Sequence, residues 1–170
     1  MDLDVLTARL IHVVGGIFWV GAFIFVNFFL APSLVEAGPD GAKVMSGVMK
    51  RRYMPIMMTV AMLTILSGVW LYWKASMGFS VVYMKSGPGH AYAIGGLLSV
   101  LAFVIGVSVT RPSMTKAMDL AQRASAPGAS DRDSLLAEAQ RLRSRGTIAG
   151  KVVTVLILLA AVLMAIGRYL

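Results

Sequence analysis

The stretch LIHVVGGIFWVGAFIFVNFFLA, residues 10–31, decides the fold class of this 170-residue chain. It runs for 22 residues without a formal charge. At about 1.5 Å of rise per residue, a helix of this length crosses the roughly 30 Å of hydrocarbon in a bilayer. We therefore expect residues 10–31 to form a helix that spans a membrane.

Two polar side chains interrupt this apolar run, His12 near its start and Asn27 near its end. A polar group inside a bilayer is costly unless it faces a partner, so it is a candidate functional residue by default. Steps of three or four residues place both on one stripe of the helix, with Gly15 beside it: Arg9, His12, Gly16, Trp19, Phe23 and Asn27. We expect that stripe to face protein or a cofactor.

The composition of the whole chain agrees with a membrane protein. Hydrophobic residues make up 58% of it and the mean hydropathy is +0.77, both far above the values of a soluble domain. We predict a single all-α membrane domain over residues 1–170, a bundle of four transmembrane helices in up-down order. The predicted spans cover about residues 10–31, 54–77, 90–110 and 147–170. Because one such chain makes a narrow bundle, we also expect a homo-oligomer.

Residues 113–145 are the clearly polar part of the chain. They predict a helical loop in two pieces, divided near residues 126–129, with the second piece capped near Ser130 or Asp131. Pro112 stands at the end of the third span. Because proline lacks a backbone N–H, we expect it to stop that helix.

The basic residues predict the orientation in the membrane. Twelve of the 16 Lys and Arg residues lie in the connections between spans one and two and between spans three and four, which leaves four on the other side. Loops rich in Lys and Arg stay in the cytoplasm, so both long connections are expected there, with both termini outside. The net charge of +8 then reports membrane orientation, and we expect no nucleic-acid partner.

Several kinds of chemistry find no support in the sequence. The chain has no cysteine, which excludes thiolate zinc sites, iron–sulfur clusters and thiol nucleophiles. None of its eight carboxylates falls inside a predicted span, so a carboxylate proton relay is not expected. Phosphate-cradling and zinc-protease motifs are missing from the sequence as well. An enzyme built on this chain would be a redox enzyme with a bound cofactor.

The two histidines of the chain, His12 and His90, fall at a similar depth on the outer side of the predicted bundle. Imidazoles from two helices can hold a b-type haem between them. Around His12, the candidate cofactor contacts comprise two glycines that would admit a flat macrocycle, an aromatic lining residue and a partner for a propionate: Gly15, Gly16, Trp19 and Arg9. Gly95 and Gly96 point away from His90 and are expected to serve helix packing.

Other interpretations of these residues stay open. A histidine near a helix end is often only interfacial, and Gly15 with Gly16 can form a packing seam. Thioethers at i, i+4 and i+8 on the second span would suit Cu(I): Met54, Met58 and Met62. A copper-handling transporter is therefore the alternative function, and a structural or assembly factor without a cofactor is the second alternative.

Four segments carry a family resemblance: IHVVGGIFWVGAFIFVNFFLAPSL (11–34), MSGVMKRRYMPIMMTVAMLTILSGVWL (45–71), GHAYAIGGLLSVLAFVIGV (89–107) and PSMTKA (112–117). Together they resemble the HemJ-type protoporphyrinogen oxidases and the related CopD-like four-helix families of bacterial membranes. The likeness covers most of the chain outside residues 121–145. It implies a b-type haem protein of the bacterial inner membrane.

Within this resemblance, His12 matches the haem histidine of the first helix and Arg52 matches a basic residue at the entry of the second. His90 matches the histidine of the third helix, where the family pattern is His-x-Lys. This chain has Tyr92 in place of that lysine. The histidine that the family uses for haem is therefore matched, whereas the pattern that accompanies the oxidation of protoporphyrinogen is incomplete. We expect a haem b membrane protein of electron transfer or oxidoreduction, with His12 and His90 as metal ligands and electron donor and acceptor unidentified.

Overall fold

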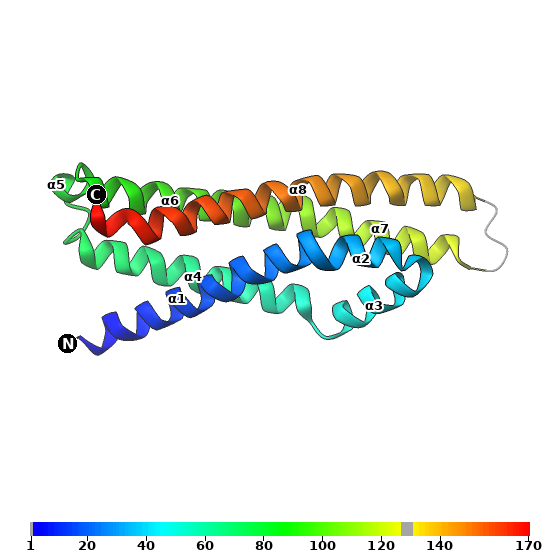
Figure 1. Cartoon of the computed structure of the whole chain (residues 1–170), viewed down its shortest axis with the longest axis horizontal. Helices are drawn as coiled ribbons and strands as arrows, with labels where there is room; N and C mark the ends of the chain where they lie inside the picture. The colour runs from blue at the N-terminus through cyan, green and yellow to red at the C-terminus, as the bar shows by residue number, and fades with distance from the viewer. Residues whose placement is uncertain (1, 127–130) are drawn as a thin grey trace.

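Figure 1 shows the computed structural model of the chain, which describes residues 2–126 and 131–170, as a bundle of long helices lying side by side. Four helices of this described part are long and apolar enough to cross a membrane. The prediction of an all-α bundle of four spans is therefore confirmed. In chain order the elements are α1 (Leu3–Ile24), η1 (Phe25–Leu30), α2 (Ala31–Glu36), α3 (Gly38–Lys50), α4 (Tyr53–Ala75), α5 (Val81–Met84), α6 (Gly87–Ile105), η2 (Gly106–Thr110), α7 (Arg111–Ala124), α8 (Arg132–Ile166) and η3 (Gly167–Tyr169).

The long helices run back and forth between two ends of the molecule. Both chain termini and α5 lie at one end, which we call the terminal end (Figure 1). The turn between α2 and α3, together with α7 and the start of α8, lies at the other, which we call the basic end. α1 packs along α4, and α6 packs along α8. Smaller contacts join α1 to α8 and α4 to α6, so α1 and α6 stand diagonally across the bundle.

The centre of the bundle is one cluster of buried apolar side chains. Every long helix contributes to it: Trp19 from α1, Ala61 from α4, Ala102 from α6, and Val153 and Ile157 from α8. Across the described chain nine of the fourteen buried hydrophobic residues are alanines, as is usual where helices approach closely in a membrane. Most large apolar side chains elsewhere on the spans face outward, for example Phe18, Leu66 and Leu97. This outward apolar surface is the one that a lipid bilayer covers.

The third long helix does not end at Pro112, so that prediction was wrong. α6, η2 and α7 follow one another without a break and form a single helical rod over residues 87–124. Proline removes one backbone donor and crowds the carbonyl four residues earlier. A wider π-helical turn, η2, stands directly before it and relieves that crowding. The first long helix repeats the arrangement, with Pro32 following η1.

The predicted polar loop is in fact a two-helix stalk, which we define as α7 together with residues 132–145 of α8. The two predicted helical pieces are present, but the second continues without interruption into the fourth span as α8. Lys116 of α7 forms an ion pair with Glu138 of α8 at 2.8 Å. Asp131 precedes α8 but makes no side-chain cap hydrogen bond. Ser130 and most of the predicted division at residues 126–129 lie outside the described residues.

The first and third long helices repeat each other at a spacing of 80 residues. Eight positions between 15 and 37 are identical to those 80 residues later: Gly15, Gly16, Val20, Ala22, Phe23, Pro32, Ser33 and Ala37 match Gly95, Gly96, Val100, Ala102, Phe103, Pro112, Ser113 and Ala117. Both copies carry a π-helical turn before the proline. Each copy also packs against the long helix that follows it. The bundle is therefore two similar helical hairpins, α1 with α4 and α6 with α8.

Candidate functional site around His12

The candidate site lies where α1 packs on α4. His12 is half-buried there, and its Nδ1 lies 2.8 Å from the backbone carbonyl oxygen of Thr64. A carbonyl oxygen can only accept a hydrogen bond, so Nδ1 must carry the hydrogen. In a neutral imidazole this leaves the lone pair on Nε2 free. A histidine that binds a metal through Nε2 has this tautomer.

A glycine of α4 makes room for this imidazole. A Cβ atom on Gly68 would lie 2.7 Å from Cε1 and 2.9 Å from Nδ1 of His12, closer than real Cβ contacts. The hydrogen bond to Thr64 and the flat backbone at Gly68 together fix the orientation of the ring. No hydrogen bond to Nε2 of His12 is found within residues 2–126 and 131–170. The described chain thus holds one edge of the ring and leaves Nε2 without a hydrogen-bond partner.

Gly15 and Gly16 lie one turn further along α1. A Cβ atom on Gly15 would lie 2.5 Å from Oγ1 of Thr64, whereas one on Gly16 would be 3.8 Å from the nearest atom, Cγ2 of Thr64. Oγ1 of Thr64 itself donates to the carbonyl oxygen of Val60. Gly15 therefore allows α1 and α4 to approach closely, and α4 fills the space beside it. For Gly15 the structure agrees with the interpretation of a packing seam between two helices.

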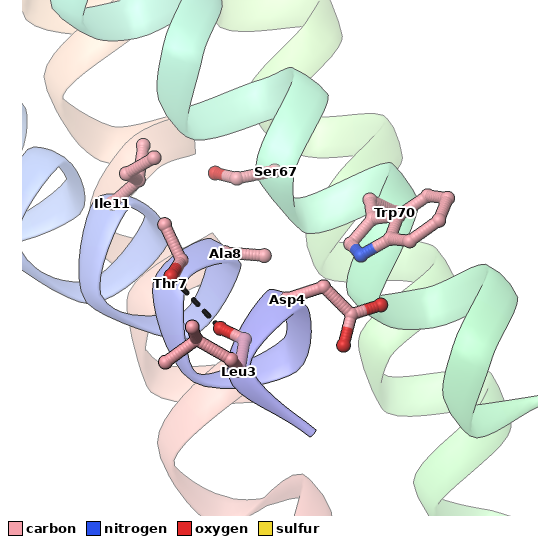
Figure 2. A pocket seen from close by; sticks show the side chains of 7 residues that line it. All are labelled: Leu3, Asp4, Thr7, Ala8, Ile11, Ser67 and Trp70. Atoms are coloured by element: carbon pink, nitrogen blue, oxygen red, sulfur yellow. Dashed lines mark hydrogen bonds between the residues drawn. The ribbon is translucent and has the colours of Figure 1, made fainter.

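An open groove lies at the terminal end, between α1 and α4 (Figure 2). Its volume is about 460 Å³, within the range of roughly 300–1,000 Å³ that ligand pockets occupy. The lining residues are Leu3, Asp4, Thr7, Ala8, Ile11, Ser67 and Trp70. Ile11 and Ser67 immediately precede His12 and Gly68 in the sequence. The groove therefore follows the same helix seam as the candidate site.

Charged side chains flank this part of the seam. Asp4 at the mouth of the groove forms an ion pair with Lys74 of α4 at 3.1 Å. Arg9, three residues before His12, is exposed and takes no part in the ion pairs of the described chain. A free guanidinium on an exposed helix face can bind a carboxylate of a ligand. Arg9 is therefore available at the edge of the site, although it does not face protein as the stripe predicted.

His90 occupies the first turn of α6 and is exposed. Its Nδ1 lies 3.0 Å from the carbonyl oxygen of Ser86, so the same reasoning assigns a hydrogen to Nδ1 and a free lone pair to Nε2. The adjacent Gly89 carbonyl accepts a hydrogen bond from the Tyr72 hydroxyl at 3.2 Å. Tyr72 is one turn beyond Gly68 on α4, about 6 Å along the helix. The two histidines therefore belong to neighbouring levels of the terminal end.

The two imidazoles have different partners in the described chain. His12 contacts α4, whereas the hydrogen bond of His90 is to its own helix. They share no hydrogen-bond partner among the described residues. Their helices, α1 and α6, stand diagonally in the bundle. Joint ligation of one iron by both rings stays a prediction.

Two further sequence candidates lie away from His12. Trp19 is buried, with 3% of its surface exposed, in the central cluster of the bundle. Arg52 is exposed in the left-handed conformation (φ +60°) directly before α4. Twelve residues of helix separate it from Thr64, which amounts to about 18 Å. Trp19 thus contributes to the core, and Arg52 belongs to the basic end.

The methionines of the copper alternative are all on α4. Met54 and Met58 are half-buried and Met62 is exposed. Within the residues that the structure describes, no group of three or more His, Asp or Glu side chains is arranged to hold a metal ion.

Gly95 of α6 packs against α8, where a Cβ atom would lie 3.0 Å from Cε of Met164, whereas Gly96 faces open space. The packing role predicted for this pair is confirmed for Gly95 alone.

Sequence reasoning about His12 missed its partners, Thr64 and Gly68. One signal was available, since an isolated glycine inside an apolar helix often marks a close approach of another element. The second hairpin repeats the contact, because a Cβ atom on Gly167 would lie 2.7 Å from Cε1 of Tyr92. Tyr92 is the residue 80 positions after His12. Each hairpin therefore seats one ring against a glycine, which lies within α4 in the first hairpin and directly after α8, in η3, in the second.

Comparisons of the chain with models of protein families, with curated proteins and with solved structures found no match.

Proposed function

We propose that the protein is a membrane-embedded b-type haem protein of electron transfer or oxidoreduction, with His12 as an axial ligand. The observation that carries the proposal is the hydrogen bond from Nδ1 of His12 to the Thr64 carbonyl oxygen. It fixes the ring and directs the lone pair to Nε2, as in metal sites where a backbone carbonyl orients the ligand. A polar side chain with an unpartnered nitrogen in an apolar helix also needs a partner.

The residues at the terminal end fit a haem in three respects. His12 offers a neutral nitrogen ligand, and the exposed Arg9 offers a cation for a propionate. His90 offers a second free Nε2 at a neighbouring level and is the candidate for the opposite axial position. A bound haem would supply one-electron redox chemistry at this place. The resemblance to HemJ-type enzymes adds a porphyrin as the substrate class of an oxidoreductase.

We further propose that the protein lies in a bacterial inner membrane with its basic end in the cytoplasm and both termini outside. The support is the excess of Lys and Arg at the basic end. The outward apolar side chains of a bundle this narrow also support a homo-oligomer in the membrane.

Absorption spectroscopy of detergent-purified protein tests the haem proposal. We expect a Soret band in the wild type and its loss in His12→Ala, since the ligand is removed. Val13→Ala is the matched control, because Val13 is the exposed neighbour of His12 on the same helix. Both variants should elute as the wild type does. A full haem load in His12→Ala would reject His12 as the ligand, and a wild type without haem would leave a scaffold role.

The spin state of the haem iron tests whether His90 is the second axial ligand. If His90 completes the coordination, His90→Ala should retain haem and change its spectrum from low-spin to high-spin. A low-spin spectrum that is unchanged in His90→Ala would remove His90 from the site while leaving the assignment of His12 intact.

A further inference from the structure

A second groove lies on α8, where the stalk meets the fourth span. Its volume is about 530 Å³. Its lining combines two arginines and a serine with three apolar side chains: Arg141, Ser144, Arg145, Val109, Ile148 and Ala149. Val109 comes from η2 and the other five come from α8. The site is thus basic on the stalk side and apolar on the side of the span.

The basic half of this groove is free to bind an anion. Arg141 and Arg145 are one helical turn apart, and both are exposed. Neither takes part in an ion pair of the described chain. Glu138, which precedes Arg141 by three residues, is already paired with Lys116 at 2.8 Å. Two guanidinium groups with a hydroxyl between them in sequence form a donor set for phosphate oxygens.

The apolar half continues the groove along the span. Ile148 follows Arg145 by three residues and is 62% exposed, so it offers an apolar surface next to the arginine. Ser144, Ile148 and Lys151 recur at steps of four and three residues and therefore share one face of α8. An exposed apolar surface directly below a pair of arginines matches a phospholipid, whose phosphate and acyl chains are joined in the same order. A soluble phosphate compound has no acyl chain and would therefore make no apolar contact with Val109 and Ile148.

We propose that this groove binds an anionic phospholipid, with its headgroup phosphate on Arg141, Ser144 and Arg145 and an acyl chain along Val109 and Ile148. The charge of the groove favours an anionic lipid over a zwitterionic one, because no carboxylate lines it to pair with a choline group. The site is separate from His12, which lies near the terminal end of the bundle.

Native mass spectrometry of the full chain, purified in detergent with added phosphatidylglycerol, tests this site. We expect Arg141→Gln with Arg145→Gln to weaken retention of phosphatidylglycerol roughly thirtyfold, the effect of two basic residues at about 1 kcal/mol each. The matched control is Arg132→Gln with Arg143→Gln, which removes the same charge from exposed positions on the other side of α8. This control should stay within about twofold of the wild type.

Three results would overturn the proposal. The first is equal retention by the Arg141/Arg145 variant and the wild type, and the second is an equal loss in the control, which would indicate a general effect of charge. In the third, glycerol 3-phosphate or inorganic phosphate displaces phosphatidylglycerol at similar concentration, so the acyl chain adds nothing. Because the lining of this groove shares no residue with the groove at the terminal end, failure here would not bear on His12.

Discussion

At the scale of single residues, the main features of the chain are polar groups held by uncharged partners on a neighbouring helix. His12 is positioned by a carbonyl oxygen and a glycine of α4 rather than by a carboxylate. Asn27 is held by two uncharged groups, since its Nδ2 donates to the Phe23 carbonyl oxygen of its own helix at 2.9 Å and to the side-chain Oγ1 of Thr154 on α8 at 3.3 Å. Uncharged partners of this kind cost little in a membrane, because they add no charge to the interior.

Gly68→Ala should displace the imidazole of His12. The new Cβ atom would lie 2.7 Å from Cε1, so either the ring or α4 must shift. We expect a loss of about 1–3 kcal/mol in the free energy of unfolding, the usual cost of overpacking. Under the haem proposal the Soret band should fall as well. Gly96→Ala is the control, since nothing lies within 4 Å of that position. Equal unfolding curves for the two variants would contradict the contact.

Gly150→Ala should be more damaging when Asn27 is present. A Cβ atom on Gly150 would lie 2.7 Å from Oδ1 of Asn27. In an Asn27→Ala background this clash disappears, so the loss of stability from Gly150→Ala should shrink by roughly 0.5–3 kcal/mol, as for residues in contact. Unfolding of the four proteins of the cycle measures the coupling. Additive effects would show that the two residues do not touch.

The periodicity of α1 identified much of its inner face but not the surroundings of its histidine. Steps of three and four residues correctly placed Trp19, Phe23 and Asn27 toward protein, because helical spacing alone decides which residues share a face. Arg9 shares that spacing yet is exposed. His12 and Gly68 are more than 50 positions apart in the sequence. Their contact depends on the register between α1 and α4, and no local pattern encodes that register.

At the scale of elements, the two prolines show why helix ends were hard to place. Pro32 and Pro112 both lie inside continuous helical rods, each just after a π-helical turn. The usual rule that proline ends a helix assumes a regular α-helix before it. A π turn changes that geometry, and composition gives little sign of it. In η2 the turn also leaves the Thr110 hydroxyl buried and without a hydrogen-bond partner in the described chain.

The ion pair of the stalk should make its stability depend on pH. The Lys116 ammonium beside Glu138 lowers the pKa of that carboxyl below its ordinary value of 4.5. A lowered pKa in the folded state contributes stability above about pH 4.5, and this contribution is lost as the pH falls through the lowered value. Glu138→Gln should therefore melt at a slightly lower temperature than the wild type at pH 7. The two proteins should converge at acidic pH, once the Glu138 carboxyl is protonated in the folded wild type as well, and a constant difference would contradict this origin.

At the scale of the whole molecule, the sequence predicted the number of spans and the two helices of the polar segment. It did not predict that α7 and α8 continue the spans directly and form one stalk. Hydropathy identifies the part of a helix that lies in lipid and is silent about how far the helix extends beyond it. The repeat of residues 15–37 at a spacing of 80 could have been found from the sequence.

Cysteine labelling can test the proposed orientation, because the chain contains no cysteine of its own. Met77 is 82% exposed at the terminal end, and Ser125 is exposed at the end of α7. In intact cells a membrane-impermeant maleimide should label Met77→Cys fully and Ser125→Cys only after the membrane is opened. The reverse pattern would place the basic end outside and contradict the assignment from Lys and Arg.

The ring seated on glycine occurs once in each hairpin, as an imidazole in the first and a phenol in the second. Two separate, identical hairpins that paired as a dimer would carry the same ring twice and would bind any ligand of that ring in two equal places. Fusion into one polypeptide lifts this constraint, because each copy can change alone. A chain built in this way can confine a ligand of the imidazole to one half and leave the other half to hold the bundle together.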